Sequence, residues 1–209
     1  MLGLDLRDGV QGLYTYAEAD LAKLWRMAER DVQAALHDLL PALIGTYGSA
    51  ASTLAANWYD DLRQGLEVGG AFTAIPADIA DTGTHALVGW AASEAKTDEA
   101  FRTLVLGGMQ KRIANFSRLT IQESSLADPR ATGWQRVGNG ECSFCALLIG
   151  SGAVYREASA DFGAHDHCKC SAVPAFGGRP VPVRGYTPTN RNITDADRAR
   201  TRAWIAANH

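Results

Sequence analysis

The sequence has no uninterrupted apolar stretch approaching the roughly twenty residues that a membrane-spanning helix needs. Its first residues also lack the basic segment and apolar run of a secretory signal peptide, because Asp5 and Asp8 interrupt them. We therefore expect synthesis in the cytosol, which is a reducing compartment, and no association with a membrane. In that setting, clustered cysteines favour metal binding or redox chemistry over structural disulfides.

Signatures of several enzyme classes are also missing. The chain contains no Gly-x-Ser-x-Gly motif, no His-Glu-x-x-His motif, and no glycine-rich phosphate loop after a predicted strand. The tripeptide at 81–83, Asp-Thr-Gly, matches the sequence around an aspartic-protease carboxylate. It falls, however, in a region whose pattern predicts helix rather than the strands that such a site needs. These absences favour a protein that is not an enzyme.

Charged residues make up only 21% of the 209 residues, and the net charge is −3, so the protein is not a polycation built to coat nucleic acid. The distribution of charge is uneven. Residues 179–209 hold six arginines and two aspartates, a charge of +4, whereas the rest of the chain holds 14 basic and 21 acidic side chains. A basic tail behind an acidic body suggests an anionic partner, and a solvated tail accounts for it equally well.

The N-terminal part of the chain has the three- and four-residue apolar spacing of helices. Thr15 and Glu18 predict a capping box that opens the first helix, and Pro41 predicts its end or a kink. The pair Gly107-Gly108 marks either a close helix crossing or a break in the last helix. The expected helices cover about 15–41, 49–66, 76–90 and 97–125.

From Gly133 onward, short apolar runs are punctuated by glycines, which is typical of short strands and turns. Strands are predicted at 134–137, 153–155 and 171–173, with a helical turn over 144–148. Prolines then indicate an extended linker, and Thr194 caps a last short helix. The expected fold class is α+β, with a helical domain at 1–128, a small Cys/His-rich α+β module at 129–176, and a basic tail at 177–209.

All four cysteines and two of the five histidines gather in this small module. Cys142 and Cys145 form a Cys-x2-Cys pair, which lets two thiolates converge on one ion from a tight turn. His165, Cys168 and Cys170 offer further ligands, and zinc binds four such groups in a tetrahedron. The pattern predicts a structural zinc site with these five residues as its candidate ligands.

The spacing leaves the ligand set open. Alternating residues of a strand point to opposite faces, so Cys168 and Cys170 can bind together only if the backbone turns there. Otherwise His165 and Cys168 complete the set with the Cys-x2-Cys pair. His167 is a weaker candidate.

The cluster also fits a disulfide or redox centre, or simple packing. A catalytic zinc is less favoured, because such sites usually have three protein ligands and an open position. Cys142 or Cys145 with His165 can also form a nucleophile and base pair. Four basic residues on one predicted helix can touch phosphates, although a solvated face is the simpler interpretation: Arg102, Lys111, Arg112 and Arg118.

The cysteines belong to a wider pattern made of Trp134-Gln135-Arg136-Val137, Asn139-Gly140-Glu141-Cys142-Ser143-Phe144-Cys145, Val154-Tyr155, and His165-Asp166-His167-Cys168-Lys169-Cys170. This pattern resembles the C-terminal module of the Mu F-like phage head morphogenesis family, which are minor capsid proteins of tailed bacteriophages. The family pattern is an arginine-bearing strand, Cys-x2-Cys, a variable stretch and His-x-x-Cys-x-Cys. It maps onto Arg136, Cys142, Cys145, His165, Cys168 and Cys170.

The helical region resembles the actinobacteriophage branch of that family more loosely, at Leu24-Trp25-Arg26, Tyr47-Gly48 and the segment 57–63. The resemblance implies a minor head protein that acts in procapsid assembly and associates with the portal protein and with the major capsid or scaffolding protein. It also implies that the protein lies in the capsid interior of the virion, and in the host cytoplasm during assembly. The arginine-rich tail is then expected to contact packaged double-stranded DNA.

Proteins similar in this way are often described as capsid maturation proteases, so a cysteine/histidine-dependent hydrolase is the alternative function. A free-standing zinc-binding interaction module unrelated to phage is a third hypothesis. The leading expectation is a protein with no catalytic residues and a structural zinc.

Overall fold

The computed structural model describes residues 4–28, 31–138, 143–157, 160–182 and 194–208. Four helices come first, followed by a strand, a short helix, a second strand and a last helix. The helices are α1 (Leu4–Met27), α2 (Val32–Gly65), α3 (Thr84–Glu94), α4 (Asp98–Ala127), α5 (Ser143–Gly150) and α6 (Asp195–Asn208). The strands are β1 (Gly133–Val137) and β2 (Ser171–Ala175). The predicted α+β class, with a helical N-terminal part and a small later module that carries the cysteines, is confirmed.

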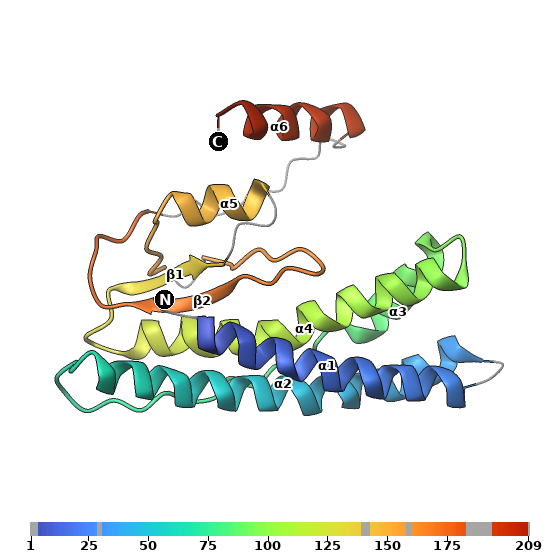
Figure 1. The fold of residues 1–209 in the computed structure, drawn as a ribbon, viewed down its shortest axis with the longest axis horizontal. Helices are drawn as coiled ribbons and strands as arrows, with labels where there is room; N and C mark the ends of the chain where they lie inside the picture. Colours follow the sequence, from blue (N-terminus) through green and yellow to red (C-terminus); the bar gives the residue numbers. More distant parts are fainter. Residues whose placement is uncertain (1–3, 29–30, 139–142, 158–159, 183–193, 209) are drawn as a thin grey trace.

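The elements lie in layers. The long helices α1, α2 and α4 lie side by side, with α2 packed against both of the others (Figure 1). Strands β1 and β2 pair antiparallel, with Gly133 opposite Ala175 and Val137 opposite Ser171, and both strands pack on α4. Helix α5 lies on the other side of the sheet from α4, and α6 lies beyond α5 (Figure 1).

The crossing of α2 and α4 forms the centre of the core. Gly48 on α2 allows this close approach, because a side chain there would collide with the ring of Phe116 on α4. Within the described residues, α2 is the one helix that is long and apolar enough to cross a membrane. Core helices pass the same test, and the buried apolar side chains of α2 belong to the common core. The largest of them are Leu36, Leu40, Ile44 and Tyr59.

The predicted first helix is wrong at both ends. Helix α1 already contains Thr15, whose hydroxyl is 3.5 Å from the carbonyl oxygen of Gln11, and it ends at Met27. Helix α2 begins after Asp31, whose carboxylate accepts a 3.0 Å hydrogen bond from the backbone N–H of Ala34. The prediction failed because the three- and four-residue apolar spacing continues from one helix into the next, and so conceals the break.

Pro41 does not end a helix. It lies inside α2, which continues to Gly65. A proline inside a helix removes one backbone hydrogen bond, at a cost of about 3 kcal/mol. On either side of Pro41, Leu40 and Ile44 are completely buried. Burial of a leucine or isoleucine side chain stabilises by about 1.5–3 kcal/mol, so two such residues offset the loss.

The helix predicted from Pro76 is wrong up to Gly83, and α3 covers only Thr84–Glu94. The segment before it runs in extended form along α2 and α4, held by side chains of those helices. The hydroxyl of Ser52 donates to the carbonyl of Ala77 at 2.6 Å, and the N–H of Ala77 donates to the Thr120 hydroxyl at 3.0 Å. These long-range hydrogen bonds pair the N–H and carbonyl groups of Ala77, which in a helix would pair with backbone groups of the same helix.

Helix α4 begins at the predicted position, with the Thr97 hydroxyl accepting a 3.1 Å hydrogen bond from the N–H of Ala100. It runs without a break through Gly107 and Gly108. Side chains at these positions would collide with His167 and with Leu87 of α3, respectively. The glycine pair is therefore a place of close contact on two sides, as the close-crossing interpretation predicts.

The far end of α4 is fixed to α2 by a buried ion pair. Arg63 Nε lies 2.7 Å from Asp128 Oδ2, and the Tyr59 hydroxyl donates to the same carboxylate oxygen at 3.1 Å. Burial, together with the neighbouring Asp128 charge, raises the pKa of Tyr59, so the phenol stays protonated. The predicted strands at 134–137 and 171–173 are confirmed as β1 and β2, whereas Val154 and Tyr155 form isolated bridges only.

Candidate metal centre

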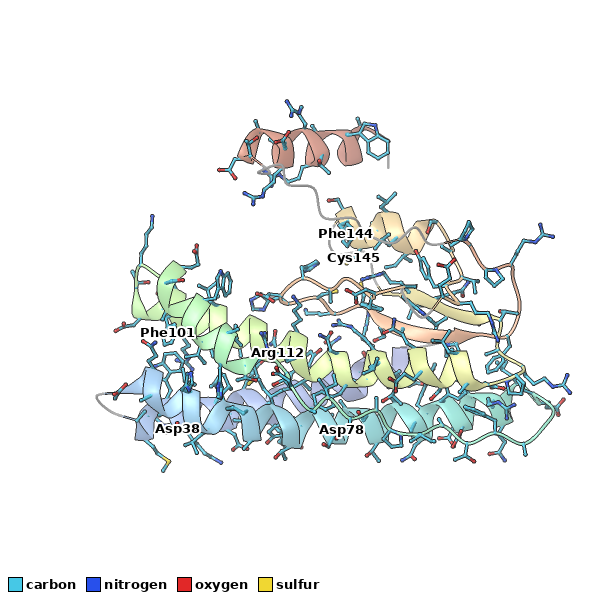
Figure 2. All side chains as sticks on the ribbon, turned by 180° about the vertical axis from the view of Figure 1, so that it is seen from behind. Asp38, Asp78, Phe101, Arg112, Phe144 and Cys145 are labelled. Atoms are coloured by element: carbon cyan, nitrogen blue, oxygen red, sulfur yellow. The ribbon has the colours of Figure 1, made fainter. Side chains whose placement is uncertain are left out.

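Three cysteine sulfurs come together between α5 and the start of β2. Cys145 lies in the first turn of α5, where Figure 2 labels it next to Phe144. Cys168 and Cys170 lie just before β2, which begins at Ser171. All three side chains are buried, and the three Sγ atoms lie within 4.8 Å of one another.

The sulfur spacing is compatible with binding of one metal ion. The Sγ atoms of Cys145 and Cys168 are 3.8 Å apart. Two sulfurs bound to one zinc at about 2.3 Å in a tetrahedron are separated by about 3.8 Å, whereas a disulfide bond measures about 2.05 Å. None of Cys145, Cys168 and Cys170 is part of a disulfide bond. A zinc ion with tetrahedral coordination could therefore bind both sulfurs at their present separation.

Cys168 and Cys170 converge because the backbone turns before them. His167 has a positive φ of 59°, in a turn that also brings the N–H of Cys168 to the carbonyl of His165 at 3.2 Å. Residues 168–170 precede the regular strand, so the alternation of strand faces does not separate the two thiols. Gly138 leaves room for the Cys170 sulfur, because a side chain at Gly138 would collide with it.

His165 faces the cluster with the right ring nitrogen. Its Nδ1 lies 2.6 Å from the carbonyl oxygen of Asp166, which can only accept, so Nδ1 carries the proton. Nε2 is then the ring nitrogen that carries the lone pair, and it lies 3.7 Å from Cys145 Sγ. A backbone carbonyl that fixes the tautomer in this way is the usual outer partner of a metal-binding histidine.

His167 is not part of the cluster. Its ring packs against Gly107, and its Nδ1 lies 3.1 Å from the amide oxygen of Gln110 on α4. The amide nitrogen of Gln110 in turn donates to Glu18 on α1. His167 thus fixes the loop to the helices, which agrees with its weaker place among the candidate ligands.

Arg136 on β1 lies directly beside the sulfurs. Its Nη1 is 3.9 Å from Cys145 Sγ and 4.0 Å from Cys168 Sγ. The guanidinium also stacks 3.8 Å from the centre of the Phe162 ring and donates to the Phe162 carbonyl. A buried cation held in this position favours the thiolate over the thiol form.

Arg118 on α4 provides a second buried cation. Its side chain donates to the carbonyl of Cys168 at 2.8 Å and to that of Cys170 at 2.9 and 3.1 Å. Its guanidinium lies 4.6 Å from the Phe162 ring, so two arginines contact this ring. Two positive charges next to the cysteines offset the negative charge that a metal bound by three or four thiolates would carry.

The acid–base properties of the cysteines are linked. The Cys170 thiol donates to Cys168, and this bond, with the charge of Arg118, lowers the pKa of Cys168 below its ordinary value despite burial. The same bond and burial raise the pKa of Cys170. Near neutral pH the pair therefore holds one thiolate and one proton. A divalent metal ion would displace this proton, as ligand thiols must be deprotonated.

Of the five predicted ligands, the structure brings four together: Cys145, His165, Cys168 and Cys170. Cys142 lies outside the described residues. Zinc is compatible with this donor set, in which three thiolates are joined by His165 or Cys142 as the fourth ligand. When bound, the ion would supply a structural cross-link between α5 and the segment before β2.

Two residues of the site escape prediction from the sequence. The sequence pattern favours a solvated helix face for Arg118, yet its side chain is only 2% exposed. Its burial could have been inferred from helix spacing, because Arg118 lies four residues after Ala114 and three before Ile121, on the buried face of α4. Phe162, which both guanidiniums contact, carries no signal that distinguishes it from an ordinary core residue.

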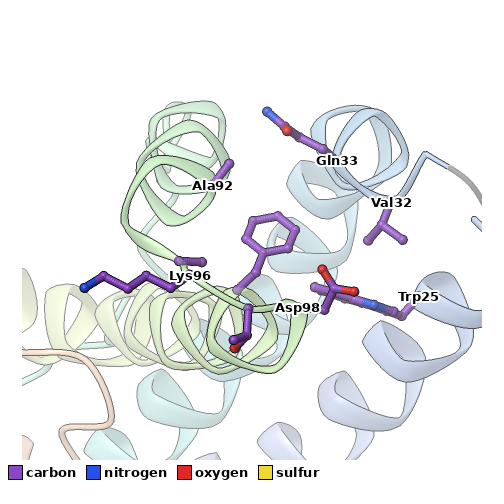
Figure 3. Close-up of a pocket in the computed structure, with 9 residues that line it drawn as sticks. Trp25, Val32, Gln33, Ala92, Lys96 and Asp98 are labelled. Atoms are coloured by element: carbon purple, nitrogen blue, oxygen red, sulfur yellow. The ribbon is translucent and has the colours of Figure 1, made fainter.

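A cavity elsewhere among the described residues has a different chemistry. It has a volume of about 560 Å³ and lies where α1 ends and α4 begins (Figure 3). Trp25, Val32 and Phe101 give it an apolar wall, and Lys96 and Asp98 provide its charges. No cysteine or histidine is among the described residues of its lining, so the cysteine cluster is the better candidate for a site with defined chemistry.

The fold and the site together define a class of protein, a small α+β protein in which a helical scaffold carries a buried cysteine cluster. The chain belongs to the VG15 protein family, whose model matches residues 4–193. The match covers both the helical part and the cysteine module. Neither the curated proteins nor the solved structures contain a match to this chain.

Removal of the metal should expose the cysteines. We expect one zinc ion per purified chain, with thiols that react slowly until a chelator is added, because the ion occupies them. Elemental analysis and thiol titration measure this. Cys168→Ser should lose the metal, whereas His85→Ala, at an exposed histidine of α3 outside the module, should keep it. Native protein without metal whose thiols all react freely would contradict the site.

Loss of Arg118 should release the module from α4. Arg118→Met leaves the carbonyls of Cys168 and Cys170 without a donor, which should lower the free energy of unfolding by about 3 kcal/mol. Urea denaturation followed by circular dichroism measures the change. Arg102→Met, on an exposed position of the same helix, should change it by less than about 0.5 kcal/mol. Equal effects of the two substitutions would show that Arg118 does not hold the module.

Proposed function

We propose that the protein is a non-enzymatic minor head protein of a tailed bacteriophage that acts in procapsid assembly at the portal. One observation supports this most strongly. The motif that resembles the Mu F-like family runs in order from Arg136 through Cys145 and His165 to Cys170, and these residues surround a single point. The family-like pattern thus corresponds to one physical centre rather than to scattered positions.

In this proposal the metal centre is architectural. Its sulfurs are buried beneath α5, and an ion there would join α5 to the segment before β2. The module would present a rigid surface to the portal and to the major capsid or scaffolding protein. The protein would then lie in the capsid interior of the virion, and in the host cytoplasm during assembly.

Contact with packaged double-stranded DNA through the arginine-rich tail is a further part of the proposal. Arginine binds phosphate in a planar, bidentate manner, and such binding weakens as salt rises. On α6, Arg198 and Arg200 already pair with Asp195 and Asp197 of the same helix. The share of the tail in DNA binding would therefore be modest and strongly salt-dependent.

A capsid maturation protease is the second candidate, because Cys145 Sγ and His165 Nε2 lie 3.7 Å apart. This is within reach of a nucleophile and its base in a resting enzyme. Against it, the Cys145 thiol is buried and shares its surroundings with two other cysteines, which favours a metal over a substrate.

The test is the composition of purified procapsids and virions from the phage that encodes this chain. We expect a few copies of the chain per particle, and co-purification of the portal protein with the tagged chain before DNA packaging. Mass spectrometry and affinity capture measure both. Absence of the chain from every particle would contradict the proposal and favour an interaction module unrelated to phage.

The same particles distinguish the protease. If the chain is a maturation protease, Cys145→Ser should leave the major capsid protein uncleaved while the variant stays folded and bound to the particle. If the centre is structural, Cys145→Ser should release the metal and lower stability, with no specific effect on capsid protein cleavage.

A further inference from the structure

A groove runs along the side of α4. The segment around residues 160–164, between α5 and β2, forms its other wall. Two cavities of about 300 and 340 Å³ make up this groove, and they share Leu119, Gln122 and Asp161 in their linings. Shared walls make the two cavities one continuous depression. Its accessible apolar side chains are the partly buried Leu119 and Leu126 of α4, and the buried Trp134 and Phe162 complete its lining.

The charged side chains in one half of the groove are acidic. The larger half is lined by Glu123, Glu157 and Asp161, and its lining within the described part of the chain includes no lysine or arginine. In the smaller half, Lys111 lies 3.8 Å from the carboxylate of Asp166, and Arg118 is held by backbone carbonyls. An apolar floor with a carboxylate rim fits an amphipathic segment that carries both arginine and an aromatic side chain.

The tail of this chain has this chemistry. Residues 179–209 hold six arginines and two aspartates, against an acidic excess in the rest of the sequence. On α6, Trp204 is 58% exposed, and Arg200, an exposed residue that pairs with Asp197 of its own helix, lies four residues before Trp204 on the same helix face. Binding in the groove would exchange this partner within the helix for the carboxylates of the groove. Tryptophan and arginine are the residues that most often anchor protein interfaces.

The chain's own α6 does not occupy its own groove. It contacts α5, which lies on the opposite side of the sheet from α4 (Figure 1). The geometry points to the groove of one copy binding α6 of a second copy, with Arg200 against the carboxylates of Glu123 and Asp161 and Trp204 on the apolar floor. This inference does not depend on the proposed role in phage heads.

Such a contact joins two different surfaces, because each copy offers one groove and one tail. Two copies can exchange their tails in a closed dimer, and contacts that do not close in this way extend into a larger ring or a filament. The association is driven partly by charge and should weaken as salt screens the carboxylates. It would also compete with any binding of DNA by the tail, since the same arginines would serve both.

Sedimentation velocity of the full chain tests this inference. We expect a mass that rises with protein concentration in low salt and falls toward the monomer in high salt. Glu123→Arg and Arg200→Glu should each weaken the association by about tenfold or more, since each places like charges opposite one another. Glu94→Arg makes the same change on an exposed position of α3 outside the groove, and should leave association unchanged.

An equal mixture of the Glu123→Arg and Arg200→Glu proteins should associate again, because the tail of each then meets a groove of opposite charge in the other. Circular dichroism establishes that both variants are folded. Trp204→Ala should weaken the association without changing its salt dependence. A wild-type mass that stays monomeric at every concentration overturns the inference, and so does association that persists unchanged in Glu123→Arg.

Discussion

The buried guanidinium of Arg118 is the interaction on which the arrangement of the molecule depends. It projects from α4 and donates to the carbonyls of Cys168 and Cys170. A buried cation is costly unless its hydrogen bonds are made, so this backbone has to stay on α4. The same backbone carries two of the three clustered thiols. The helical part of the protein therefore sets the position of the cysteines, although it contributes no cysteine itself.

This arrangement also sets the chemistry of the cysteines. Arg136 reaches the sulfurs from β1, while Arg118 reaches the adjacent carbonyls from α4, and both contact the ring of Phe162. Two fixed positive charges favour thiolates and would offset the negative charge of a metal ion bound by them. His167 adds a mechanical link, because its ring fits against Gly107 on α4 and the turn at His167 brings Cys168 and Cys170 together.

The sequence predicts the local parts of this picture well. The spacing of Cys145, Cys168 and Cys170 indicates a shared centre, and the short strands and the Thr97 cap follow from residues close together in the chain. What it fails to predict depends on distant partners. The segment before α3 is extended because Ser52 and Thr120 bond to it. Arg118 resembles a surface residue until the cysteine segment folds over it.

The central claim is that the cysteines form a metal centre whose ligands are fixed by the fold. X-ray absorption spectroscopy at the zinc edge of the purified chain tests it most directly. The account predicts a four-coordinate ion with three or four sulfur ligands at about 2.3 Å, and one nitrogen at about 2.0 Å if His165 is the fourth ligand. A zinc ion surrounded by oxygen and nitrogen alone, with no sulfur shell, would contradict it.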